Sequence, residues 1–146
     1  MSKIIRRAAG FTMLELAIAV AIVGLLVAVA MASYQDSQAQ KARAEAVKSM
    51  LELADGLRKQ QAVSLTYLGV RLAYAQSPRQ GGAKYRFSLA AAPVQALDPA
   101  FAFPATSDLG YTLMATPAGK DACGVLLLDH TGRRGVTVGK VTDCWR

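Results

Sequence analysis

The chain has 146 residues, which is enough for one domain with an appendage and too few for two independent cores. Its net charge is +7, but three of these charges lie in a basic leader made of Lys3, Arg6 and Arg7, and the excess of +4 without them is too mild to predict nucleic-acid binding by itself. Hydrophobic residues make up 53% of the chain and concentrate in one N-terminal block, so the remainder predicts a small soluble domain.

The N-terminal block is long enough to cross a membrane. Leu16 to Gln35 contains 20 residues without a charge, and a helix rising about 1.5 Å per residue spans with that length roughly the 30 Å of bilayer hydrocarbon. The basic leader precedes this run and Asp36 follows it. The positive-inside tendency therefore predicts a cytoplasmic N-terminus and an extracytoplasmic remainder.

A cleavable signal peptide is the alternative interpretation of this block, because Ala32 ends a small-residue stretch that resembles a cleavage site before Ser33. The apolar run is, however, longer than the usual core of about 7 to 15 residues. Glu15 at its edge would hinder insertion without benefit to a signal peptide, and no Pro or Gly ends the helical pattern after Ala32. A retained helix is favoured, and an exported soluble binding protein stays open as an alternative.

The helical pattern continues into a polar region, which predicts one helix over residues 12–61. Its second half carries an apolar stripe at spacings of three and four, made of Ala39, Ala42, Ala46, Met50, Leu53 and Leu57. The first half is apolar on every side and needs lipid or other helices around it, whereas the second half needs a sheet against its stripe.

The C-terminal half alternates between loops and short strands. Residues 62–83 predict a connecting loop with a short ordered piece at 67–74, and strands are expected at 84–89, 110–116 and 124–128. Residues 129–132 suit a type I turn, and Val136, Val138 and Val141 indicate a last strand or extended tail. Three or four antiparallel strands on the stripe of one long helix give an α+β fold.

The sequence carries no motif of a catalytic or cofactor site, so we expect a protein that is not an enzyme and binds no cofactor. Two cysteines and one histidine are a poor ligand set for a metal ion. In an exported chain, Cys123 and Cys144 favour a single disulfide.

The string GFTMLEL, from Gly10 to Leu16, resembles the processing motif of type IV pilins, in which a basic leader precedes it and an apolar helix follows. The resemblance implies cleavage between Gly10 and Phe11 by a prepilin peptidase and methylation of the new amino group of Phe11. It also implies that Glu15 pairs with the amino terminus of a neighbouring subunit during assembly. A carboxylate at the edge of hydrocarbon is costly unless it is paired, which makes this role plausible.

Residues 111–145 resemble the C-terminus of minor pilins of the PilE kind, which implies that Cys123 and Cys144 join. The implied organisation is a leader at 1–10, a membrane and assembly helix at 11–35, an amphipathic helix at 36–61, and a loop and sheet at 62–146. The implied location is the inner membrane and then an extracellular pilus. The implied partners are other pilin subunits, the pilus assembly machinery and lipid, with DNA or a surface ligand left open. A pseudopilin of a type II secretion system shares the N-terminal features and is the closest alternative.

Overall fold

The structure is a computed structural model that describes residues 12–146. Its helices are α1 (Met13–Ser64) and α2 (Val141–Cys144). Its strands are β1 (Gln76–Ser77), β2 (Tyr85–Leu89), β3 (Val94–Gln95), β4 (Ala102–Phe103), β5 (Thr112–Pro117), β6 (Leu126–Asp129) and β7 (Arg134–Val136). The chain divides after Ser37 into two compact units, which we call the stem (the described residues up to Ser37) and the head (Gln38–Arg146).

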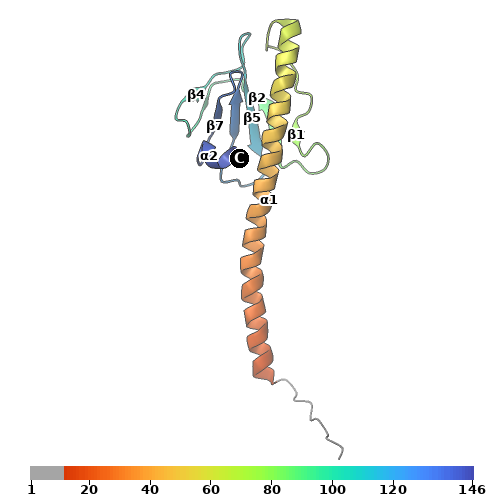
Figure 1. Cartoon of the computed structure of the whole chain (residues 1–146), viewed down its shortest axis with the longest axis vertical. Helices are drawn as coiled ribbons and strands as arrows, with labels where there is room; N and C mark the ends of the chain where they lie inside the picture. Colours follow the sequence, from red (N-terminus) through yellow and green to blue (C-terminus); the bar gives the residue numbers. More distant parts are fainter. Residues whose placement is uncertain (1–11) are drawn as a thin grey trace, which may run out of the picture. The chain divides into compact units, whose positions relative to one another are not determined.

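The stem consists of the N-terminal part of α1, drawn in red to orange in Figure 1. Its large apolar side chains are exposed all round the helix, as the uncharged run from Leu16 to Gln35 predicts. Leu16, Val20 and Val29, for example, expose 55%, 64% and 65% of their surface. By length and composition, α1 could cross a membrane.

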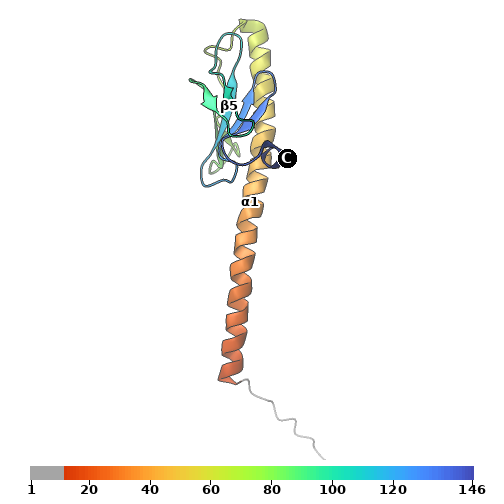
Figure 2. The ribbon, with the colours of Figure 1, turned by 90° about the vertical axis from the view of Figure 1, so that its left-hand side faces the viewer.

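The head has its core between the C-terminal part of α1 and a sheet. The predicted stripe is confirmed from Ala46 to Leu57, because Ala46, Met50, Leu53 and Leu57 are buried and form one cluster with side chains of β2, β5 and β6. Ala42 packs against this cluster at its edge, and Ala39 is not part of it. Figures 1 and 2 show the sheet lying along one side of this part of the helix. A buried aliphatic side chain contributes about 1.5–3 kcal/mol, so this stripe holds the helix to the sheet.

The main sheet has five antiparallel strands in the order β1-β2-β5-β6-β7. Tyr85 and Phe87 on β2 face the helix, and so do Leu113 and Ala115 on the neighbouring β5. The opposite face is partly covered by the small antiparallel sheet of β3 and β4. Phe103 of β4 packs there against the backbone of Gly135, where any larger residue would collide with its ring.

The expected α+β architecture is confirmed, and several local predictions are wrong. The main sheet has five strands rather than three or four, since the two-residue strand β1 lies inside the predicted connecting loop. Residues 67–74 form neither a helix nor a strand. The sequence analysis also missed β3 and β4, which are two residues long and too short to show alternation. Val141 begins α2 and does not extend a strand.

Candidate functional site

The start of α1 is fixed by Thr12. The backbone N–H of Leu16 donates to the Thr12 carbonyl oxygen at 3.1 Å, and the N–H of Glu15 donates to Thr12 Oγ1 at 3.2 Å. These two bonds make Thr12 the N-cap and Glu15 the third residue of the helix. The Glu15 side chain is exposed. Gly10 and Phe11, the predicted processing residues, lie outside the described residues.

The predicted cysteine pair is joined in the structure. The sulfur atoms of Cys123 and Cys144 are bonded at 2.00 Å, and both residues are buried in the head core. The bridge ties α2 to the segment that leads into β6. The adjacent Trp145 is also buried, and its indole N–H donates to the Gly135 carbonyl oxygen at 3.2 Å. The tail is therefore held to the sheet by one covalent bond and one hydrogen bond.

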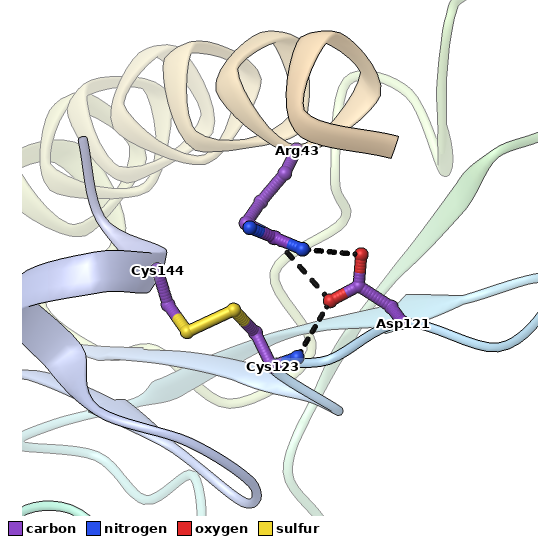
Figure 3. A network of polar contacts seen from close by, with 4 residues as sticks. All are labelled: Arg43, Asp121, Cys123 and Cys144. Atoms are coloured by element: carbon purple, nitrogen blue, oxygen red, sulfur yellow. Dashed lines mark hydrogen bonds and ion pairs between the residues drawn. A yellow bond between two sulfur atoms is a disulfide. The ribbon is translucent and has the colours of Figure 1, made fainter. Parts of the chain in front are cut away.

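An ion pair joins α1 to the loop that carries the disulfide (Figure 3). Arg43 donates from Nη2 to Asp121 Oδ2 at 2.9 Å and from Nε to Oδ1 at 3.3 Å. Asp121 Oδ1 also accepts the backbone N–H of Cys123 at 2.8 Å. Burial raises the pKa of Asp121, but the hydrogen bonds from Arg43 and Cys123 outweigh this effect and hold the pKa below its usual value. Burial of Tyr85 beside this pair raises the pKa of its phenol to about 12.

The turn after β6 is organised by Asp129, whose side chain is fully buried. The predicted turn is confirmed by the hydrogen bond from Gly132 N–H to the Asp129 carbonyl oxygen at 3.0 Å. The Asp129 carboxylate accepts the N–H groups of Thr131 and Arg133, both at 2.9 Å, together with the Thr131 hydroxyl and the Arg133 guanidinium. Burial raises the pKa of Asp129, and these donors more than reverse that effect.

Arg133 and Arg134 follow this turn and combine exposure with contacts to the fold. Both are exposed, but Arg133 forms an ion pair with Asp129 and its guanidinium lies 4.7 Å from the centre of the Phe101 ring. The guanidinium of Arg134 lies 5.4 Å from the centre of the Trp145 ring. Both side chains are therefore held in place by the fold.

Positive charge gathers on the head between residues 56 and 97. This segment contains six basic residues and no acidic one, and we call it the basic segment. Two of its cations are neutralised locally, because Arg58 pairs with Asp55 at 3.6 Å and Arg79 pairs with Glu52. Among the residues that the structure describes, no acidic side chain pairs with the remaining four exposed cations, which are Lys59, Arg71, Lys84 and Arg86.

The basic segment covers two different places on the head. Lys59 lines a shallow groove of about 470 Å³ between the last turns of α1 and Leu68 to Val70. Arg86 lies on β2 opposite Thr116 of β5 and points away from the core, since its neighbours Tyr85 and Phe87 are the buried residues of that strand. Over residues 12–146, no group of three or more His, Cys, Asp or Glu side chains is placed to hold a metal ion.

The chain thus combines an apolar helix that could cross a membrane with an α+β head whose tail is closed by a disulfide. Two family models match the chain. Residues 5–31 match the prokaryotic N-terminal methylation motif, and residues 32–127 match the family described as type IV minor pilin ComP, DNA uptake sequence receptor. The chain belongs to this family of type IV minor pilins, and it is a structural pilus subunit, not an enzyme. No curated protein matches it.

Sequence reasoning missed two features of the site. The Arg43–Asp121 pair joins residues 78 positions apart, and no local pattern indicates which of the charged residues on α1 turns toward the sheet. The net charge of the whole chain does not indicate the basic segment, because all the acidic residues lie elsewhere in the chain and are counted against its basic ones. A count of charges in short windows along the sequence would have found it.

Proposed function

We propose that the protein is a minor subunit of a type IV pilus that is inserted in the inner membrane, cleaved between Gly10 and Phe11, methylated at Phe11 and assembled through its stem. The proposal rests on the string from Gly10 to Leu16 followed by an apolar helix, in a segment that matches the N-terminal methylation motif. The basic leader stays in the cytoplasm and the head lies in the periplasm until assembly. A prepilin peptidase and the pilus assembly machinery are the proteins that it meets on this route.

We further propose that the Glu15 carboxylate pairs with the methylated amino group of a neighbouring subunit. Burial of the stem in a fibre exchanges lipid contacts for helix contacts, so little net hydrophobic energy drives assembly and charge pairing gains weight. The exposed position of Glu15 in the first turn of α1 supports this role. Within one helix the backbone limits how closely Glu15 and its own terminus can meet, whereas the terminus of another subunit approaches freely.

Mass spectrometry of the mature N-terminus tests the processing. A chain that starts at methylated Phe11 supports a pilin, whereas a chain that starts at Ser33 supports a soluble protein with a removed signal. A chain that keeps the basic leader would contradict both. Glu15→Ala should leave insertion and methylation intact and lower recovery in sheared fibres, while Asp36→Ala, which removes the acid at the other end of the apolar run, should not. Equal recovery of the two variants would contradict the pairing.

We propose DNA as the ligand of the head. The family description names a DNA uptake sequence receptor, and the matched residues contain the entire basic segment. Four of its cations are exposed and have no acidic partner among residues 12–146. They are suited to DNA phosphates, which dominate the affinity of protein–DNA complexes. Arg134 of β7 and Lys140, which precedes α2, are exposed cations as well, but they lie beyond the match, which ends at residue 127.

A binding assay with the mature protein in detergent and a labelled DNA duplex tests this assignment. Lys84→Ala/Arg86→Ala should weaken binding and lower the slope of log affinity against log salt by about two, since each phosphate contact contributes about 0.9. The matched control, Arg134→Ala/Lys140→Ala, removes the same charge outside the basic segment and should change the slope by less than one. A larger change in slope for Arg134→Ala/Lys140→Ala than for Lys84→Ala/Arg86→Ala would instead place the DNA site around Arg134 and Lys140. The absence of any salt-dependent binding would contradict DNA as the ligand.

The analysis of sheared fibres also tests whether the protein is a minor pilin or a pseudopilin. A minor pilin of the PilE kind should appear in sheared surface fibres at a small fraction of the main subunit. A pseudopilin of a type II secretion system would carry the same methylated N-terminus and be absent from such fibres. The match to a family of minor pilins favours the pilus.

A further inference from the structure

Thr12 stands at the start of α1, and the role proposed for it below rests on the proposed pairing of Glu15. The first N–H groups of a helix have no partner within the helix. At the edge of a membrane, water satisfies such groups poorly and an unsatisfied N–H is costly. In α1, the Thr12 hydroxyl accepts the N–H of Glu15 at 3.2 Å, while the Thr12 carbonyl accepts the first helical bond.

Glu15 is the acidic side chain nearest to this cap. A glutamate at the third helical position can fold back on the helix start, where N–H groups and the helix dipole attract negative charge, and in a complete capping box it accepts the backbone N–H of the N-cap residue while the threonine hydroxyl accepts its own. Within the part of the chain that the structure describes, it does not do so. Over residues 12–146, no hydrogen bond or ion pair of the chain engages the Glu15 carboxylate, and the side chain is exposed.

We propose that Thr12 is a positioning residue for assembly. Its hydroxyl satisfies the helix-terminal N–H, and this leaves the Glu15 carboxylate available for the amino group of a neighbouring subunit. Without the hydroxyl, the carboxylate turns back on its own helix and competes with the contact between subunits. Thr12 acts through Glu15 and needs no contact with the partner.

Substitutions that keep or remove the cap test the proposal in the full-length protein. Thr12→Ser and Thr12→Asn retain good N-caps, while Thr12→Val keeps the shape of threonine and loses the acceptor. Each variant is produced beside the wild-type subunit, and its recovery in sheared fibres is divided by its amount of cleaved, methylated protein in the membrane. This normalisation removes any effect on the peptidase. Ser33→Ala is the matched control, because it deletes a stem hydroxyl far from the helix start.

Thr12→Val should lower the normalised recovery about fivefold, the usual effect of losing one cap. Thr12→Ser, Thr12→Asn and Ser33→Ala should stay within twofold of the wild type. Recovery of Thr12→Val at the wild-type level, or failure of Thr12→Ser and Thr12→Asn to restore it, would overturn the proposal.

Nuclear magnetic resonance of the mature protein in a bilayer mimetic separates positioning from helix stability. Glu15→Gln should barely move the amide signals of Met13 and Leu14 when Thr12 is present, and should move them clearly in the Thr12→Val background, where the carboxylate has turned back. Equal movement in both backgrounds would refute the competition even if recovery fell. Normal recovery of Glu15→Ala in fibres would instead contradict the charge pairing, and the amide signals would still decide the role of Thr12.

Discussion

Replacement of Arg43 by Met should destabilise the head through loss of a well-placed ion pair. Methionine keeps much of the side-chain packing but removes the guanidinium, and with it the bonds of 2.9 and 3.3 Å to Asp121. The Asp121 side chain is only 5% exposed and would keep only the N–H of Cys123. A hydrogen bond to a charged group contributes about 1.5–3 kcal/mol, and breaking a buried pair costs about 3–5 kcal/mol. Because the Arg43 side chain keeps 12% exposure, we expect a loss of about 2–3 kcal/mol.

Urea unfolding of the isolated head, with its disulfide intact, measures this loss; the head is a compact unit with its own core. The matched control is Arg58→Met, which breaks a 3.6 Å pair between side chains that are 52% and 69% exposed and should cost less than about 0.5 kcal/mol. A double-mutant cycle of Arg43→Met with Asp121→Asn should give a coupling energy of at least about 1.5 kcal/mol. Equal losses for the two arginine variants, or no coupling, would refute the reasoning.

Three further predictions concern the head. Replacement of Cys123 and Cys144 by Ser should lower the free energy of unfolding by about 3 kcal/mol, as expected for a loop of this size; denaturant midpoints unchanged by the replacement would contradict it. The pKa of Asp121 is lowered, so its stabilisation is complete above about pH 4 and is lost as the pH falls through the folded-state pKa. Acid unfolding curves should therefore be flatter for Asp121→Asn than for the wild type. Leu65 has a φ of 59° and is 78% exposed, so Leu65→Gly should raise the melting temperature slightly by relieving about 1 kcal/mol of strain.

The architecture of the head could be predicted because its main signals are local. The stripe from Ala46 to Leu57 repeats at helical spacing, and the alternation of Tyr85 and Phe87 marks a strand with one buried face. Each of these signals lies within a few residues of chain. The strands β3 and β4 gave no such signal, because two residues are too few to show a period. Their formation depends on packing against β6 and β7, which are distant in sequence.

The candidate site also contains residues that the sequence makes evident and residues that it does not. Glu15 and the cysteines stand out in the sequence, since one is an acid beside a long apolar run and the others are the only two of their kind. The role of Asp121 depends on which charged side chain of α1 meets the sheet, and this needs coordinates. A threonine three residues before a glutamate is the sequence signature of a capped helix start, so the Thr12 cap could have been anticipated.

The placement of both cysteines inside the head determines what kind of cohesion a fibre can have. Since the two sulfur atoms are bonded to each other and buried, and the sequence contains no other cysteine, a subunit offers its neighbours no thiol for exchange. Fibres built from it would be held entirely by noncovalent forces. Strong detergent should therefore release single chains without any reducing agent, and reductant should change the fold of the released chain rather than its size.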